Sequence, residues 1–565
     1  MNRGSKLSMV FRRLAVVAVA PVLALALHAA QVPLFAQDAT PRVPDILPRP
    51  AIAPLPSPVT TSHEVELPDR KLAFRATAGA IAIAAADRTV LADVAYTSYV
   101  LDGVAPSMRP VVFAYNGGPG SASTWLHIGA MGPWRVPLTA EVIAGRTPAE
   151  PIPNAESWLD FADLVFIDPP GTGHSRIWPS HQAAGAGGTY AQLVLPRPRA
   201  PGRRIGRPLV PGSDRNEGGP GWFWSLEGDI ATFVEVIAAW LERNGRAGSP
   251  VVLVGESYGG FRTPLIAKGL HDTHAIRVAA MVLVSPVLDF DGRRGWRTPA
   301  HHIALLPSLA ATHIERGGGV PTREALAEAE TYSSGDYLLD LMRGPRDLAA
   351  VQRMTDRVTN LAGLHAEVVR QHSGRVSIGA FLEAGKARLP DVAAVSIYDA
   401  GMAGLAPVHG GRRRGYSDPF ITGLGSPLTA AMASLHQRVS WQTKRPYAMM
   451  SGEVNRRWIW PGQPSPPQVL QTLHELHSRD ARLRTLVTHG FTDLVTPYFA
   501  SALQLDQLPA HGPVQRISLE VYPGGHMFYS RDRSRQQFRQ NSLGLIGEAT
   551  AAVADKRDRQ GRETP

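Results

Sequence analysis

Residues 251–260 read VVLVGESYGG, and this stretch is the strongest indication of the fold. Its apolar run is typical of a strand buried on both faces. The G-x-S-x-G string from Gly255 to Gly259 follows the run and precedes a predicted helix over 261–270. A strand, a tight turn and a helix in this order form a nucleophile elbow, where glycines let a strained turn expose a serine hydroxyl. Ser257 is therefore the candidate nucleophile.

Short apolar runs that end in a turn recur along the chain. They lie at 109–115, 164–167, 281–284, 486–488 and 519–521. Apolar residues at helical spacing separate several of these runs, as in 229–243. Alternating strands and helices predict a mostly parallel central sheet with helices on both faces. Residues 63–100 instead alternate polar and apolar residues, which predicts antiparallel strands at one sheet edge.

The 565 residues divide into parts of different composition. The predicted parts are a signal peptide (1–36), a proline-rich linker (37–62), a first core part (63–289) with an inserted loop (176–221), a mainly helical cap (290–480), a second core part (481–550) and a disordered tail (551–565). Glycine, proline and arginine without periodicity predict the loop, and proline-rich composition predicts an extended linker.

The N-terminus has the layout of a secretory signal peptide. Basic residues between 3 and 13 precede an apolar run over 14–27, and small residues follow, up to Ala36. The run is short for a membrane span, although an uncleaved anchor is the alternative. We therefore expect a periplasmic or secreted protein with no stable membrane span after signal removal.

The bulk composition excludes several kinds of site. Hydrophobic residues make up 44% and charged residues 19% of the chain, an ordinary globular balance. The absence of cysteine excludes disulfides, thiolate nucleophiles and cysteine-ligated metals. The net charge of +10 comes without a recognition motif, so no nucleic-acid binding is predicted. The sequence does not predict an oligomeric state.

A serine nucleophile requires a histidine base and a carboxylate that orients the histidine. In folds with this elbow, the order along the chain is serine, acid, histidine. Asp493 and His526 each follow a predicted strand, in that order, and glycines beside them permit close approach. They are therefore the candidate partners of Ser257.

Other histidines are rivals. His489 lies near Asp493 but precedes it, which breaks the expected order. Two further sets, His271 with His274 and His301 with His302, have the spacing of metal ligands. No acidic partner stands at ligand spacing, so we predict surface or packing roles for them and no metal site.

An oxyanion hole requires backbone N–H groups directed at the developing negative oxygen. Tyr258, the residue after the nucleophile, supplies one such group. The glycine-rich turn from Asn116 to Gly120 ends an earlier predicted strand and permits close approach of the main chain. We predict Gly118 as the second donor.

Four stretches resemble signatures of the serine carboxypeptidase family, in the order of that family. They are NGGPGSAS (116–123), DPPGTGHS (168–175), GESYGG (255–260) and GGHM (524–527). The resemblance covers roughly residues 63–545. Within the family, the chain resembles an exported bacterial type. It implies an α/β-hydrolase fold and release of C-terminal amino acids from peptides with a free C-terminus, through an acyl-enzyme, without metal or cofactor.

The family pattern matches Ser257, Asp493 and His526 as the triad, and Gly118 and Tyr258 as oxyanion donors.

The resemblance also implies that Asn116 and Glu256 bind the substrate carboxylate, since a protonated glutamate can donate a hydrogen bond to a carboxylate. This pocket departs from the family pattern. Ala130 stands where the best-known members have a second glutamate, Ala114 where they have a tryptophan, and Ser121 where they have a cysteine. An esterase or acyltransferase on the same scaffold is therefore the alternative, and a non-catalytic binding protein is the second.

Overall fold

The computed structural model describes residues 55–85, 88–106, 109–138, 140–143, 149–178, 193–194, 220–291, 298–388, 392–405, 418–461 and 467–562. The predicted signal peptide, most of the predicted linker and most of the predicted inserted loop lie outside these residues. The described residues all belong to one unit, Gln37–Pro565. None of their helices is both long enough and apolar enough to cross a membrane.

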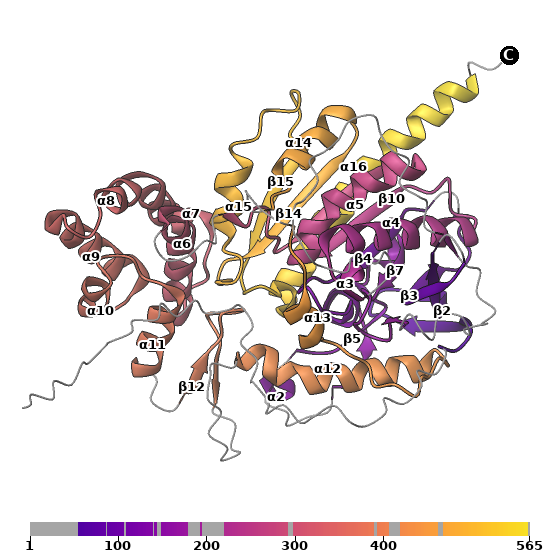
Figure 1. Cartoon of the computed structure of the whole chain (residues 1–565), viewed down its shortest axis with the longest axis horizontal. Helices are drawn as coiled ribbons and strands as arrows, with labels where there is room; N and C mark the ends of the chain where they lie inside the picture. The colour runs from indigo at the N-terminus through magenta and orange to yellow at the C-terminus, as the bar shows by residue number, and fades with distance from the viewer. Residues whose placement is uncertain are drawn as a thin grey trace, which may run out of the picture. The chain divides into compact units, whose positions relative to one another are not determined.

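A large sheet runs through the fold in the strand order β1-β2-β3-β7-β4-β10-β11-β14-β15 (Figure 1). The strands are β1 (Val59–Glu66), β2 (Lys71–Ala84), β3 (Val90–Leu101), β4 (Val111–Tyr115), β7 (Asp163–Ile167), β10 (Val251–Glu256), β11 (Val278–Val284), β14 (Arg484–Gly490) and β15 (Ile517–Tyr522). Two short strands, β8 (Arg176–Ile177) and β9 (Leu193–Val194), pair with β3 and β2.

The pairing confirms the predicted sheet. From β7 to β15 each pair of neighbours is parallel, while β1, β2 and β3 are antiparallel, as is β3 with β7. Every residue of β4, β7 and β10 is buried, which explains why these strands read as continuous apolar runs. Each of the six apolar runs found in the sequence overlaps a strand of this sheet.

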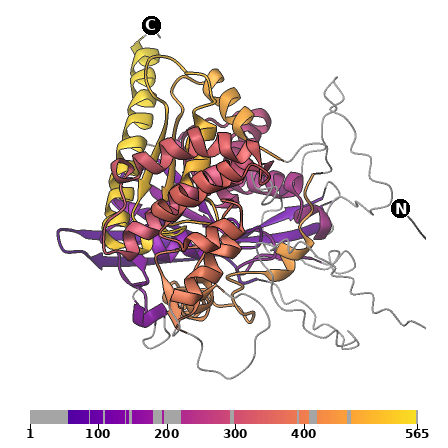
Figure 2. The same cartoon turned by 90° about the vertical axis from the view of Figure 1, so that its left-hand side faces the viewer.

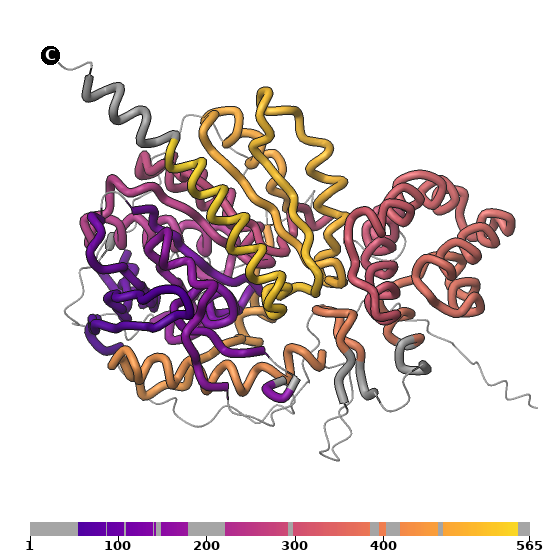
Figure 3. Tube along the Cα trace, turned by 180° about the vertical axis from the view of Figure 1, so that it is seen from behind, coloured from indigo at the N-terminus to yellow at the C-terminus, as the bar shows by residue number. Residues whose placement is uncertain are grey.

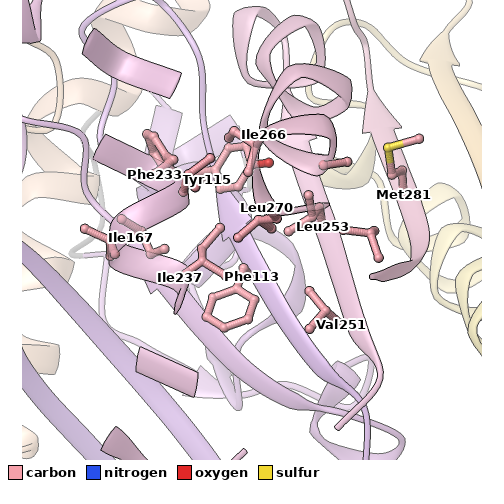
Figure 4. Packing of buried hydrophobic residues seen from close by; sticks show 14 of the residues in the cluster. Phe113, Tyr115, Ile167, Phe233, Ile237, Val251, Leu253, Ile266, Leu270 and Met281 are labelled. Atoms are coloured by element: carbon pink, nitrogen blue, oxygen red, sulfur yellow. The ribbon is translucent and has the colours of Figure 1, made fainter. Parts of the chain in front are cut away.

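Helices cover both faces of the sheet. On one face α4 (Leu226–Arg243) and α5 (Tyr258–His274) pack together, and α5 contacts β10 and β11. On the other face α16 (Asp532–Arg562) contacts β11 and β14, and Figure 3 shows this helix from behind. Phe113 and Leu253 from the sheet meet Phe233, Ile237 and Leu270 from the two helices in the main core (Figure 4). This is the α/β-hydrolase fold that the sequence predicts.

The segment between β11 and β14 is mostly helical, and Figure 2 views the fold from its side. It contains α6 (Pro299–Arg316), α7 (Arg323–Tyr332), η6 (Ser333–Tyr337), α8 (Leu338–Arg343), α9 (Leu348–Ala362), α10 (Ala366–Gln371), α11 (Ile378–Arg388), β12 (Val392–Val395), β13 (Ala403–Leu405), α12 (Pro419–Arg438), α13 (Gly452–Arg457) and α14 (Leu470–Arg479). A separate apolar cluster, including Leu309, Met354 and Val358, holds α6 and α9 together.

The remaining described elements are short or lie next to the site. They are α1 (Thr124–Leu126), η2 (His127–Met131), β5 (Trp134–Arg135), α2 (Ala140–Ile143), β6 (Ile152–Pro153), η3 (Trp158–Asp160), α3 (Pro220–Phe223), α15 (Tyr498–Leu505) and η7 (Phe528–Ser530).

Some predicted boundaries differ from the structure. Strand β1 begins at Val59, inside the predicted linker, because it pairs along its whole length with β2. Helix α14, predicted as the end of the cap, buries Leu473 in the core of the sheet and packs on α5. Helix α16 continues to Arg562, through most of the segment predicted as a disordered tail.

Candidate active site

Ser257 lies on a strained turn between β10 and α5. Its φ of 61° falls in the left-handed region, which non-glycine residues rarely adopt. The flanking glycines are sterically required: a Cβ on Gly255 would lie 2.2 Å from the carbonyl oxygen of Gly259, and one on Gly259 would lie 2.9 Å from that of Tyr115. The Ser257 amide donates to the carbonyl of Val284 at 2.8 Å. The elbow is therefore formed as the G-x-S-x-G string predicts.

The structure brings His526 and Asp493 into direct contact. They follow the neighbouring parallel strands β15 and β14, whose last residues are in register. Nδ1 of His526 lies 2.7 Å from Oδ2 of Asp493, and both side chains are buried. Oδ1 of Asp493 accepts hydrogen bonds from the amides of Val495 at 2.7 Å and Thr496 at 2.9 Å. A carboxylate held in this way fixes the tautomer and the orientation of the imidazole.

Main-chain contacts hold His526 at the same sheet edge as Ser257. The His526 carbonyl accepts from Oγ of Ser285 at 2.8 Å, and the His526 amide donates to the carbonyl of Tyr398 at 2.5 Å. Ser285 directly follows Val284, which accepts from the Ser257 amide. The loops that carry Ser257 and His526 are thus joined through the end of β11.

Sequence reasoning missed Thr496, Ser285 and Tyr398. Oγ1 of Thr496 donates to Oδ2 of Asp493 at 2.5 Å and lies 3.1 Å from Nδ1 of His526. A hydroxyl three residues after an aspartate is a local turn signal that could have identified Thr496. Ser285 and Tyr398 are distant from His526 in the chain, so no spacing pattern indicates them.

The glycine-rich turn after β4 packs against the backbone of the elbow. A Cβ on Gly117 would lie 2.5 Å from the amide nitrogen of Tyr258 and 2.6 Å from the carbonyl oxygen of Glu256. Gly118 has a φ of 103°, which favours glycine. The turn containing Gly118 therefore lies beside the Tyr258 amide, where two N–H donors could serve one oxyanion.

We expect Gly117→Ala to reduce kcat by about 100- to 1000-fold, as the loss of an oxyanion donor does. The added methyl meets backbone atoms, which cannot rotate away, so the turn must move from Tyr258. The measurement is steady-state hydrolysis of an activated ester. Gly425→Ala, at a helical position with nothing within 4 Å of the added Cβ, is the control. A wild-type kcat for Gly117→Ala would show that this turn does not serve the reaction.

A later segment of the chain anchors the same turn. The amide of Ser451 donates to the carbonyl of Gly120 at 2.7 Å, and Nδ2 of Asn455 donates to the carbonyl of Pro119 at 3.1 Å. The sequence prediction placed both anchors in the cap. In the structure they support the site directly, with Val454 buried in the core of the sheet.

Glu256 is buried beside the nucleophile and accepts a hydrogen bond from an unexpected partner. The hydroxyl of Tyr529 donates to its Oε2 at 2.5 Å. Oδ1 of Asn116 accepts from the amide of Leu126 at 3.2 Å. Its buried Nδ2 lies near enough to Glu256 to affect that carboxyl, but it is not placed for a well-formed hydrogen bond with any described residue. Ala130, also buried, contributes no polar group. The predicted pair of Asn116 and Glu256 is thus present, with Tyr529 added.

Burial raises the pKa of Glu256 to about 7. The positive charge of His526 and the donors of Tyr529 and Asn116 act in the opposite direction and lower this pKa. Below about pH 7 the carboxyl is therefore mostly protonated and can donate a hydrogen bond.

Two of the rival histidines, His489 and His274, have structural partners. Burial lowers the pKa of His489 to about 4, and its ring nitrogens contact the carbonyl of Thr496 at 3.1 Å and Oγ of Ser501 at 2.8 Å. His274 lies 3.0 Å from Glu235. Within the described ranges, no group of three histidine or acidic residues is placed to hold a metal ion.

Tyr258 has a structural role besides its amide. Its hydroxyl donates to Oδ2 of Asp229 at 3.1 Å, and Arg262 pairs with the same carboxylate at 3.1 Å. Its ring meets the edges of Trp458 and Trp460, with centroids 5.3 and 5.7 Å apart. The first turn of α5 is thereby fixed on both sides, which holds the Tyr258 amide in place.

The fold, the serine elbow and the histidine–aspartate pair define a hydrolase-type α/β protein. Residues 96–289 match the family model described as serine carboxypeptidase. The segment contains the elbow and three of the four family-like stretches, from residue 116 to residue 260.

Individual proteins show weaker similarity. The chain is 39% identical over 66 residues to the pheromone-processing carboxypeptidase KEX1 of Cryptococcus gattii, which is 12% of this chain and only 9% of that protein. Among solved structures it is similar to KEX1(Δ)p, a prohormone-processing carboxypeptidase from Saccharomyces cerevisiae (TM-score 0.49, 13% identity, 84% of this chain and 92% of that chain). It is also similar to proline iminopeptidase from Mycobacterium smegmatis (TM-score 0.33, 14% identity, 87% and 100%).

Proposed function

We propose that the protein is a serine-type carboxypeptidase that releases C-terminal amino acids from peptides through an acyl-enzyme. The observation that carries this proposal is the juxtaposition of the serine elbow with a buried carboxyl, Glu256, and the buried side-chain amide of Asn116. A hydrolase of simple esters needs no such pair beside its nucleophile. The family match of residues 96–289 supports the same reaction class.

In the proposed mechanism Ser257 attacks the scissile carbonyl carbon. His526 takes the serine proton and later gives it to the leaving amine, and Asp493 orients the imidazole and stabilises its positive charge. The amides of Gly118 and Tyr258 bind the oxyanion of each tetrahedral intermediate. Water then releases the acyl group from Ser257. The resemblance implies no cofactor, and none of these steps requires one.

In the proposed substrate site, protonated Glu256 and the amide of Asn116 donate hydrogen bonds to the terminal carboxylate of the peptide. An ionised Glu256 would instead repel that carboxylate. Peptides with a free C-terminus would therefore be preferred over amides or esters, and the preference would depend on the protonation of one buried group.

The proposal is tested by release of the C-terminal residue from an N-blocked dipeptide, beside the matched C-terminal amide and the matched ester. We expect turnover of the free acid, little of the amide, and none by Ser257→Ala. Ester turnover with an untouched dipeptide would instead indicate an esterase or acyltransferase, which the missing carboxylate at Ala130 favours. A fluorophosphonate that failed to label Ser257 would support a non-catalytic binding protein.

The preference for a free carboxylate is expected to fall as pH rises through about 7. Burial raises the pKa of Glu256 to about 7, so the donating form is present below this pH and is lost above it. The measurement is the ratio of kcat/KM for the free acid to kcat/KM for the ester across about pH 5 to 9, in which the titration of His526 cancels. Glu256→Gln keeps a donor without an ionisable group, so its ratio should not fall. A wild-type ratio that stays constant would contradict the role of Glu256.

We further propose an exported location, periplasmic or secreted. This rests on the basic and apolar pattern of residues 1–36 alone. N-terminal sequencing of the protein after expression with its full leader would test it, with cleavage near Ala36 as the expected result.

A further inference from the structure

Tyr529 lies three residues after His526, in η7, and is buried. Its hydroxyl donates to Oε2 of Glu256 at 2.5 Å, although the two residues are 273 positions apart in the chain. Burial and the charge of Glu256 raise the pKa of Tyr529 well above its ordinary value. The phenol therefore keeps its proton throughout the working pH range, and the direction of this hydrogen bond does not change.

The neighbouring π-helix η2 leaves room for the Tyr529 ring. A Cβ on Gly129 would lie 3.2 Å from Cε2 of the ring, which is tighter than ordinary contact. Ala130, the next residue in η2, stands where the family resemblance leads one to expect a second glutamate. Small side chains on η2 thus accompany a tyrosine that reaches the carboxyl from another element.

The backbone of Tyr529 is held as firmly as its hydroxyl. Its carbonyl accepts from Nη1 of Arg535 at 3.2 Å. Arg535 is itself fixed by Glu156 at 3.1 Å and by Asp532 at 2.6 Å. A phenol placed by this many contacts can orient the group it binds, because little further ordering is needed.

We propose that Tyr529 is a positioning residue for substrate selection, which occupies one oxygen of Glu256 and leaves the other, with Asn116 Nδ2, to the terminal carboxylate of a peptide. This inference rests on the proposed function. A pair of carboxyl groups must share a proton to coexist at short distance. A tyrosine and a carboxyl need no shared proton, so this arrangement keeps its geometry when Glu256 ionises.

The hydrogen bond favours the ionised form of Glu256, so its removal should make the carboxyl harder to ionise. For Tyr529→Phe we expect the midpoint of the pH-dependent ratio of free-acid to ester kcat/KM to rise by about 1 to 2 pH units. Site-specific replacement of Tyr529 by a fluorinated tyrosine keeps the ring and makes the phenol a stronger donor. It should move the midpoint downward.

Tyr522→Phe is the matched control, because it removes a buried tyrosine hydroxyl that instead contacts Nδ2 of Asn541 at 3.0 Å. Its midpoint should equal that of the wild type. A midpoint unchanged in both Tyr529 variants, with ester turnover present to show that they fold, would overturn the inference. The fluorinated variant keeps the test decisive if Tyr529→Phe does not fold.

A measurement without substrate separates this inference from the proposed function. The carboxyl carbon of Glu256 is titrated by NMR in the Ser257→Ala protein, with Glu256→Gln assigning the signal, before and after Tyr529→Phe. A raised midpoint confirms the Tyr529–Glu256 coupling even where the dipeptide assay shows no carboxypeptidase. An unchanged NMR midpoint counts against Tyr529 whatever the dipeptide assay shows.

Discussion

Ser257→Ala is expected to reduce kcat by about 10⁵- to 10⁶-fold, because the attacking oxygen is lost and the histidine has no proton to take. The residual rate would come from the oxyanion donors and from substrate binding. The measurement is single-substrate kinetics with the activated ester, which gives the widest range of measurable rates. Loss of fluorophosphonate labelling is measured beside it.

The control for Ser257→Ala must account for backbone strain. Ser257 has a φ of 61°, a conformation that is strained for alanine as well. Ser373 is suited to this, because it is also half-buried, has a φ of 52° and lies in the helical segment after α10. Ser373→Ala should keep wild-type kcat. A loss for Ser257→Ala no greater than tenfold would exclude Ser257 as the nucleophile.

Asp493→Asn is expected to reduce kcat by about 10⁴-fold through the wrong histidine tautomer. Oδ1 of Asp493 accepts from two backbone amides, so the asparagine must place its carbonyl oxygen there. Its NH₂ group then takes the position of Oδ2 and faces both Nδ1 of His526 and the hydroxyl of Thr496. His526 can accept from this group only by moving its own proton to Nε2, where the base must be free.

The measurement is kcat for the activated ester, with Asp340→Asn as the matched control. Asp340 is also a buried carboxylate, but it pairs with Arg353 in the helical segment. The control should retain kcat within about threefold. If Asp493→Asn also retained kcat, a different carboxylate would have to orient the histidine.

Several features of the site could be predicted from the sequence because they depend on neighbours in the chain. The elbow at Ser257 follows from a strand, a turn and a helix that are consecutive in the chain, with glycines where the backbone allows no Cβ. Asp493 and His526 could be selected from many residues because each follows an apolar strand, and parallel strands present their ends at one edge. The family-like stretches that begin at Asn116 and Gly255 also predicted that the turn after Asn116 lies beside the elbow.

Other features could not be predicted, since their partners are far apart in the chain. Tyr398 holds the His526 amide from a segment read only as cap, and Ser451 holds the turn at Gly120 from the same predicted segment. These contacts are made between backbone amide and carbonyl groups, so no side-chain pattern marks them. Helix α14 lies in the segment predicted as cap but packs on the core, because apolar spacing does not identify the surface that a helix covers.

The sequence by itself determined the sheet, the proposed order of nucleophile, acid and base, and the resemblance of the central segment to a family, because local periodicity and turn geometry depend on neighbouring residues. Only the tertiary structure decided what surrounds Glu256. Ala130 leaves the family pattern of the carboxylate pocket only half matched, whereas the fold brings Tyr529 to the carboxyl of Glu256 from the far end of the chain. A hydrogen bond between residues 256 and 529 depends on tertiary packing, including that of η2 on η7, and this packing is a property of the whole core.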